Sequence, residues 1–352
     1  MPNIKTRHFI YLALIALPLL GAQCVKVNTG GAGNDGGVFK SLNQGQEWKQ
    51  KAAIPTVSGT PKSFASFDVI TLTQDPSDAL AIYAGTKENG MLYSYDGGES
   101  WRQPKQLVSG KVNAIAIDPK DKCNIYVATG SRLVKSTDCN RTFLEVNNNV
   151  NEVTALAIDS ANSANIYIGD AKGVVLKSQT GGQSWQMAKN FGGKVVDLII
   201  NPKNASMIYA AVFPKGVWRS NDGGVNWEDL SASFKKLTNS SSIRRLAMSQ
   251  GVPEVLLAAS KYGLLRTKDG GQTWEPLTLV TKPSTVDLSA LAVSPKDANE
   301  IYYTTAATFY RSLDGGVSWA TKKMPTSRAG MYLLVDRIDP KVIYMGVVKI
   351  EK

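Results

Sequence analysis

The sequence predicts an all-β protein, a single β-propeller of seven four-stranded blades, from two repeated patterns and from how they begin and end. The first pattern is an eight-residue phrase, Ser-x-Asp-Gly-Gly-x-x-Trp or a near copy, whose copies end at Trp48, Trp101, Phe143, Trp185, Trp227, Trp274 and Trp319. Successive copies are 42 to 53 residues apart. A period of this length indicates one supersecondary unit per repeat, stacked so that neighbouring units bury each other's apolar faces.

The second pattern alternates with the first and consists of an apolar strand, an Asp-Pro-like turn and an Ile-Tyr strand. The clearest copy runs from Val112 to Pro119 and continues at Ile125-Tyr126. Its relatives lie at 70–83, 153–167, 195–209, 243–257, 288–302 and 333–344. Together the two patterns predict about four strands in each repeat.

The two ends of the chain each carry half of a repeat. The first phrase, residues 38–48, has no strand pair before it, and the last strand pair, which ends at Val347, has no phrase after it. Joined, the two halves complete one blade. We therefore expect the ring to be closed by N- and C-terminal strands, which leaves only short, protected sheet edges.

The composition of the eight-residue phrase explains why it recurs. Its Asp can accept hydrogen bonds from the backbone of its own turn, and its Gly pair supplies the positive φ angles of a tight turn. Its Trp can lie beneath the turn and fasten it to the blade. These residues are therefore predicted to be structural, as listed here: Asp96, Trp101, Asp138, Asp222, Trp227, Asp269, Trp274, Asp314 and Trp319.

The phrase resembles the Asp-box, or bacterial neuraminidase repeat, of several propeller families. These are sialidases, xyloglucanase-type glycosidases, sortilin-type receptors and the photosystem II assembly-factor propellers. The assembly factors are similar in size, blade number and lipoprotein-like export, and this resemblance implies a role in assembling a membrane complex. The Asp-box turn serves enzymes and binding proteins alike, so it says more about fold than about function.

The N-terminus is predicted to direct export. Lys5 and Arg7 precede an apolar run over residues 9–20, which is typical of a secretory signal. We expect a signal peptide at 1–23, a Gly-rich tether at 24–36 and the propeller at 37–352. The segment resembles a bacterial lipoprotein signal with Cys24 as the lipidated residue, although Gln23 departs from the Gly or Ala of that family. Cleavage near Ala22 with a free thiol, or an uncleaved signal anchor, remains the alternative.

The other two cysteines, Cys123 and Cys139, fall within one predicted blade. Cys123 begins the second strand and Cys139 lies in the turn after the third, where antiparallel neighbours bring them together. A disulfide fits an oxidising compartment. Two unpaired buried thiols are the alternative.

The sequence lacks the residues of most catalytic and cofactor sites. Its one histidine is His8, inside the signal, which excludes His-dependent triads and His-containing metal sites in the mature protein. We therefore expect no cofactor, no metal and no catalytic residue, although hydrolysis by carboxylates alone stays open. The carboxylates expected near the ring centre or its loops are better explained by solvation or ion pairing: Asp68, Glu88, Asp170, Asp197, Asp287 and Asp336.

The charge balance favours an anionic partner. Forty Lys and Arg face 29 Asp and Glu, a net charge of +11, which falls to +9 when Lys5 and Arg7 leave with the signal. The Asp-box and Asp-Pro turns should share one face of the ring, so the remaining loops form the other, basic face. The predicted partner-binding residues there are Lys235, Lys236, Arg244, Arg245, Lys322, Lys323 and Arg328. Ordinary solubilising charge is the alternative.

One register of the innermost strands carries an unusual pair. Ala114, Ala155 and Ala290 occupy it in three blades, whereas Asp197 and Arg245 occupy it in two neighbouring blades. We expect these two to form an ion pair at the ring centre. A central anion or peptide site that includes Arg244, Arg245 and Arg337 is the less favoured interpretation.

These observations predict an exported, extracytoplasmic monomer, lipid-anchored to a bacterial membrane, that binds a protein or other anionic partner as an assembly scaffold. Nucleic acid is not an expected partner. The alternative is a glycan-directed propeller, either a lectin-like binder or a His-free, sialidase-like glycoside hydrolase. A roomy pocket with two carboxyls would favour hydrolysis, and a filled channel under a basic face would favour binding.

Overall fold

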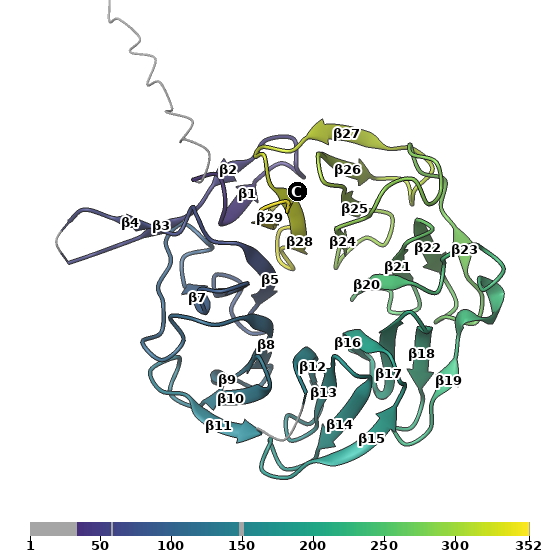
Figure 1. Cartoon of the computed structure of the whole chain (residues 1–352), viewed down its shortest axis with the longest axis horizontal. Coiled ribbons are helices and arrows are strands. Elements are labelled where there is room, and N and C mark those ends of the chain that lie inside the picture. The colour runs from purple at the N-terminus through teal and green to yellow at the C-terminus, as the bar shows by residue number, and fades with distance from the viewer. Residues whose placement is uncertain (1–33, 58, 148–150, 352) are drawn as a thin grey trace, which may run out of the picture.

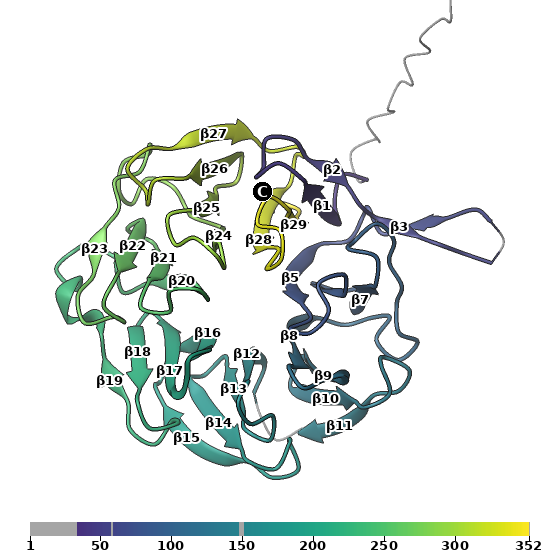
Figure 2. The same cartoon turned by 180° about the vertical axis from the view of Figure 1, so that it is seen from behind.

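The computed structural model describes residues 34–57, 59–147 and 151–351, and they form a ring of antiparallel sheets around a central axis (Figure 1). Seven sheets serve as blades, and a short two-stranded sheet adjoins them. Viewed from behind, the same ring shows the innermost strands of all the blades around the centre (Figure 2). The predicted seven-bladed propeller is confirmed.

We number the blades from the N-terminus, so that blade 1 is the one made by both chain ends. Blade 1 contains β28 (Ala329–Val335), β29 (Ile343–Val348), β1 (Val38–Ser41) and β2 (Lys49–Gln50). Blade 2 contains β5 (Val69–Gln74), β6 (Ile82–Thr86) and β7 (Met91–Ser94). Blade 3 contains β8 (Val112–Asp118), β9 (Asp121–Thr129), β10 (Arg132–Ser136) and β11 (Leu144–Asn147).

The remaining blades follow the same order from the centre outward. Blade 4 contains β12 (Val153–Ile158), β13 (Ile166–Asp170), β14 (Val174–Ser178) and β15 (Gln186–Asn190). Blade 5 contains β16 (Lys194–Asn201), β17 (Asn204–Phe213), β18 (Gly216–Ser220) and β19 (Glu228–Asp229), and a 3-10 turn, η1 (Ser231–Ser233), follows it. Blade 6 contains β20 (Ile243–Met248), β21 (Leu256–Ser260), β22 (Leu264–Thr267) and β23 (Glu275–Pro276), and blade 7 contains β24 (Ala290–Val293), β25 (Ile301–Thr304), β26 (Thr308–Ser312) and β27 (Ala320–Lys323).

The predicted ring closure is confirmed. In blade 1, β29 lies between β28 and β1, and it pairs antiparallel with β1 so that Lys40 faces Tyr344 and Ser41 faces Ile343. The apolar side chains of β29, such as Ile343 and Met345, are fully buried. The C-terminal strand therefore bonds the N-terminal strand into the ring.

Blade 2 departs from the predicted four strands. At its outer edge, pairing is limited to one bridge between Tyr93 and Arg102. Pro104 follows two residues later and has no N–H to donate, which explains why a strand does not continue there. The backbone N–H of Trp101 instead donates to Ala53, at the base of a hairpin formed by β3 (Ala53–Ile54) and β4 (Lys62–Ser63). This hairpin projects beyond the rim of the ring (Figure 1).

The Asp-box turns have the predicted local geometry. In blade 2, Gly97 and Gly98 have φ angles of 69° and 80°, in the region that favours glycine. The Ser94 hydroxyl accepts the N–H of Gly98 at 2.8 Å, and the Asp96 carboxylate accepts the N–H of Ser100 at 2.9 Å. The Asp side chain therefore stabilises its own turn, as expected.

A second set of bonds, which the sequence analysis did not predict, ties the Asp-box turns of blades 2, 4, 5 and 6 to the preceding blade. The Tyr167 hydroxyl and the Lys177 ammonium of blade 4 both donate to the Gly223 carbonyl of blade 5, each at 2.9 Å. Equivalent pairs hold other blades together: Tyr209 and Arg219 on Gly270, and Tyr344 and Lys40 on Gly97. The Tyr of the Ile-Tyr pattern therefore hydrogen-bonds its blade to the next one, and we call this contact the inter-blade latch.

The disulfide between Cys123 and Cys139 is confirmed, and it joins β9 to the Asp-box turn of blade 3. That turn lacks the Gly pair. Cys139 and Asn140 occupy its two positive-φ positions, at 57° and 71°. The bridge therefore fastens the one turn whose sequence is least suited to its backbone.

The predicted signal peptide and Cys24 lie outside the described residues. Of the predicted tether, Asp35 and Gly36 are bonded to the ring: the Asp35 carboxylate accepts the Ser327 N–H at 2.9 Å, and the Gly36 N–H donates to Ala65. Where the structure describes the chain, no helix has the length and apolar character to span a membrane.

Candidate functional site: a basic mouth at the ring centre

A depression of about 710 Å³ opens at the centre of the ring, on the face opposite the Asp-box turns. Innermost strands start at this face and run toward the Asp-box face, so the residues that begin them surround the opening. Lys194 is the first residue of β16, and Lys111 directly precedes β8. We call this site the basic mouth and define it by the six cationic residues that line it: Lys87, Lys111, Lys194, Arg244, Arg245 and Lys349.

Apolar side chains complete the lining of the basic mouth. They come from the same strand ends and include Val196, Phe213, Ile243, Leu288 and Val348. Phe213 is 39% exposed, which is unusual for a phenylalanine and leaves its ring available for contact. The site therefore presents cations beside an apolar wall, which is the chemistry that binds an amphipathic anion.

Carboxylates partly neutralise the cations. Lys111 pairs with Glu152 at 2.6 Å, Arg244 pairs with Asp287 at 2.9 Å, and Lys87 pairs with Glu351. Among the residues that the structure describes, Lys194 and Lys349 form no ion pair. Partial burial, and after it the nearby Lys111 cation, lower the pKa of Lys194 below its usual range. The mouth therefore has an excess of positive charge, and a bound anion would reduce the repulsion among its cations.

The floor of the mouth holds the predicted ion pair. Arg245 Nη1 lies 3.9 Å from Asp197 Oδ1, and the backbone N–H of Leu246 donates to the other carboxylate oxygen at 2.8 Å. Burial raises the pKa of Asp197 to about 6, against the opposing effect of Arg245. The Asp197–Arg245 pair is confirmed.

Tyr332 of blade 1 completes this cluster, and the sequence analysis did not include it. The Arg245 guanidinium lies over its ring at 5.1 Å, and Arg245 Nη2 donates to the Met331 carbonyl at 3.3 Å. Burial raises the pKa of the Tyr332 hydroxyl, so it stays neutral at physiological pH. Three side chains from three blades thus meet at this level of the ring.

The structure distributes the seven predicted partner-binding residues over different places. Arg244 and Arg245 line the basic mouth. Lys235 and Lys236 are exposed beyond β19, where Lys235 pairs with Asp229 at 2.6 Å, and Lys322 and Lys323 are exposed on the outermost strand of blade 7. The structure therefore brings two of the seven to the central site.

Arg328 directly precedes β28, at the face of the basic mouth, but its side chain is enclosed. It is 6% exposed, and its guanidinium pairs with Asp68 at 2.6 Å and with Asp35 at 3.2 Å. Its charge holds the N-terminal segment against the ring, and its assignment as a partner-binding residue stays a prediction. Arg337 lies on the other face, where its N–H donates to Gln74, so the predicted grouping with Arg244 and Arg245 does not occur.

Five of the six carboxylates considered for hydrolysis have other partners, and the sixth, Glu88, is exposed. Asp170 and Asp336 are buried and accept backbone N–H groups of their own turns, from Lys172 at 2.9 Å and Ile338 at 2.8 Å. Asp68, Asp197 and Asp287 are paired with arginines, as described above. No cluster of three or more His, Cys, Asp or Glu residues that could hold a metal occurs in the described parts of the chain.

Part of the chain matches a known protein family in sequence. The family described as "Photosynthesis system II assembly factor YCF48" matches residues 196–339, which is less than half of the chain. No curated protein sequence matches it. The predicted resemblance to photosystem II assembly factors is confirmed over the matched residues, and the resemblance to sortilin-type propellers stays a prediction.

Solved structures support the fold. YCF48 bound to D1 peptide has a TM-score of 0.61 at 13% identity, over 86% of this chain and 97% of that one. YCF48 from Cyanidioschyzon merolae has a TM-score of 0.62 at 13% identity, over 84% and 98%. The GH74 xyloglucanase from Xanthomonas campestris has a TM-score of 0.68 at 16% identity, over 80% of this chain but 51% of the enzyme. The chain thus spans about half the length of that enzyme.

Proposed function

We propose that the protein is an exported, membrane-tethered assembly scaffold that binds an acidic segment of another protein in the basic mouth. The excess of cations around an apolar-walled depression carries this proposal. Cations attract and orient an acidic chain during encounter, and the apolar wall then binds the aliphatic or aromatic side chains that alternate with its carboxylates.

A peptide fits this site better than an isolated small anion does. The cations that line the mouth come from five of the seven blades and are spread around the opening, so one phosphate or carboxylate could reach only a few of them. An extended segment with several carboxylates could reach more. The structurally similar YCF48 that holds a D1 peptide is a propeller with a bound peptide, which supports this choice.

The second candidate is a glycan-directed propeller, which the likeness to GH74 xyloglucanases favours. Hydrolysis without histidine would need one carboxyl to act as acid and another as base or nucleophile. At the basic mouth the carboxylates of Glu152, Asp287 and Asp197 each lie beside a cation. This arrangement favours binding over hydrolysis.

The test uses the mature chain and a fluorescein-labelled peptide of alternating Glu and Leu as the probe. Fluorescence anisotropy should show affinity that falls as NaCl rises from about 50 to about 500 mM, because salt screens exposed charges. The double change Lys194→Glu and Arg244→Glu should weaken binding by about tenfold or more. A matched reversal on the Asp-box face, Lys268→Glu with Lys341→Glu, should change it little, because both side chains are exposed there.

Two results would contradict the proposal: binding that does not depend on salt, or equal loss in both double variants.

The membrane tether has its own test. Mass measurement of the N-terminal peptide from the membrane fraction should find a diacylated or triacylated Cys24. An unmodified Cys24 thiol would remove lipid anchoring from the proposal and leave the peptide site untouched.

A further inference from the structure

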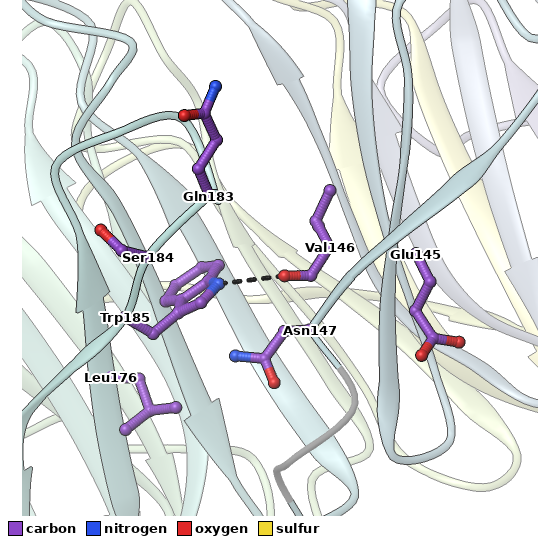
Figure 3. Close-up of a pocket in the computed structure, with 7 residues that line it drawn as sticks. All are labelled: Glu145, Val146, Asn147, Leu176, Gln183, Ser184 and Trp185. Atoms are coloured by element: carbon purple, nitrogen blue, oxygen red, sulfur yellow. Dashed lines mark hydrogen bonds between the residues drawn. The ribbon is translucent and has the colours of Figure 1, made fainter.

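A second depression, of about 510 Å³, lies on the outer rim between blades 3 and 4. From β11 it is lined by Glu145, Val146 and Asn147, and from blade 4 by Leu176, Gln183, Ser184 and Trp185 (Figure 3). We call it the Trp185 groove. It shares no residue with the basic mouth.

Comparison among the repeats shows what is unusual about Trp185. The other five Asp-box tryptophans each have an aromatic ring packed edge to face at a centroid distance of 4.9 to 5.7 Å, as follows: Trp48 with Phe309, Trp101 with Phe64, Trp227 with Phe191, Trp274 with Phe234 and Trp319 with Tyr303. Trp185 has no such neighbour among the described residues.

The sequence gives the reason. Phe191 and Phe234 follow the outermost strands of blades 4 and 5 and cap the tryptophan of the next blade. After the phrase of blade 3, residues 144–152 read Leu-Glu-Val-Asn-Asn-Asn-Val-Asn-Glu and contain no aromatic residue. This stretch of the sequence therefore supplies no counterpart of Phe191 or Phe234.

Trp185 is nevertheless held in place. Its indole N–H donates to the Gly182 carbonyl at 3.0 Å. It also donates to the Val146 carbonyl at 3.3 Å, as Figure 3 shows. Both bonds are made at the edge of the ring, and the indole packs against the apolar cluster that contains Tyr126 and Leu133. The rest of the indole lines the groove. A fixed aromatic face of this kind needs no further ordering when a ligand stacks on it.

We infer that the Trp185 groove binds a neutral sugar ring of a glycan. The apolar C–H face of a pyranose stacks on an indole, and its hydroxyls need donors and acceptors around the ring. Glu145, Gln183 and Ser184 supply a carboxylate, an amide and a hydroxyl at the groove. This combination of one aromatic face with planar polar side chains is suited to vicinal hydroxyl groups.

The Trp185 groove differs from the basic mouth in the charge of its lining. No Lys or Arg lines the Trp185 groove, and Glu145 lies 3.8 Å from Arg132 at its margin. An acidic ligand would meet the Glu145 carboxylate here, so the groove disfavours anions that the mouth would attract. The inference therefore does not depend on the proposed function of the mouth.

The test titrates the mature chain with cellohexaose, laminarihexaose and chitohexaose, followed by calorimetry and tryptophan fluorescence. At least one of these neutral oligosaccharides should bind, and Trp185→Ala should weaken that binding by about tenfold or more, because the stacking face is lost. Gln183→Ala and Glu145→Ala change exposed side chains, so both should fold and should weaken binding about threefold or more.

Blade 6 offers a matched control. Its phrase has Gln272 and Trp274 where blade 4 has Gln183 and Trp185, but Phe234 caps Trp274. Gln272→Ala should leave the affinity unchanged, and so should the mouth reversal Lys194→Glu with Arg244→Glu. Failure of all three sugars to bind, or binding that survives both Trp185→Ala and Gln183→Ala, would overturn the inference. Binding of a proline-rich peptide instead, lost in Trp185→Ala, would overturn it as well.

Discussion

At the scale of single residues, the ionisation of Asp197 determines how much of the positive charge of Arg245 remains for a ligand of the basic mouth. With a pKa of about 6, the Asp197 carboxyl is ionised at neutral pH and offsets the guanidinium 3.9 Å away. Its neighbours are Arg245, Lys194 and Tyr332, so no second carboxyl group adjoins it. The one histidine of the chain is His8, so no imidazole of the ring titrates there either.

We therefore expect acidic peptide binding to tighten as pH falls. Protonation of Asp197 below about pH 6 removes the anion beside Arg245, so affinity for the Glu-Leu peptide should rise by up to about tenfold between about pH 8 and pH 5. Asp197→Asn should bind tightly at both pH values. Because the folded pKa exceeds the ordinary Asp value of about 3.9, the contribution of Asp197 to stability should also rise as pH falls from about 6 toward 4. An unchanged pH profile in Asp197→Asn would contradict this role.

The Asp-box tryptophans should differ in what they contribute to stability. Trp101 is fully buried and packs edge to face on Phe64 at 5.6 Å, so Trp101→Ala should cost about 3–5 kcal/mol. Trp185 is half-buried and uncapped, so Trp185→Ala should cost less, on the order of 1–2 kcal/mol. Urea unfolding of both variants measures the difference. Equal losses would mean that Trp185 is capped as tightly as Trp101.

The residues that sequence reasoning found and missed have a common explanation. Asp197 and Arg245 were predictable because their strands share one register with Ala114 and Ala155. Tyr332 occupies the same level after the same register shift, but its strand belongs to the repeat that is split between the chain ends. Arg328 looked like an ordinary loop cation, because nothing in its sequence reveals that Asp35 and Asp68 enclose it.

At the scale of elements, the Asp-box turn of blade 3 lacks the glycine pair and is instead fastened by a disulfide. Cys139 adopts a φ of 57°, which costs a non-glycine residue about 1–2 kcal/mol, and the disulfide to Cys123 offsets that cost. The sequence allowed this to be predicted, because the poorest copy of the phrase is the one that contains a cysteine. The inter-blade latch was not predictable, because an Ile-Tyr pattern does not say which carbonyl the hydroxyl reaches.

The bridge and the turn can be separated by mutation. Cys123→Ser with Cys139→Ser should lower the unfolding free energy by about 3 kcal/mol, the value for a short closed loop. Cys123→Ser with Cys139→Gly should recover about 1 kcal/mol of this, because glycine adopts positive φ without strain. Denaturant unfolding measures both. If the Gly variant were no more stable than the Ser variant, the turn would not be strained at Cys139.

At the scale of the whole molecule, ring closure creates the basic mouth. Lys349 follows the last strand and Lys87 follows the second strand of blade 2, and they meet at one opening because β29 is bonded next to β1. The sequence predicted the ring and its basic face. It could not rank the cations within that face, since the six that converge are separated by up to 262 residues and share no motif.

Closure should therefore be essential to folding, and a truncation tests this. Deleting residues 343–352 removes β29, which exposes the edges of both β28 and β1 and uncovers apolar surface that is now buried, so we expect aggregation and loss of cooperative melting. Deleting only 349–352 leaves every strand pair of blade 1 intact and removes the exposed pair of Lys87 with Glu351, which should cost less than about 1 kcal/mol. Size-exclusion chromatography and thermal melting compare the two. A longer truncation that stayed soluble and melted like the full chain would show that blade 1 is not held by its C-terminal strand.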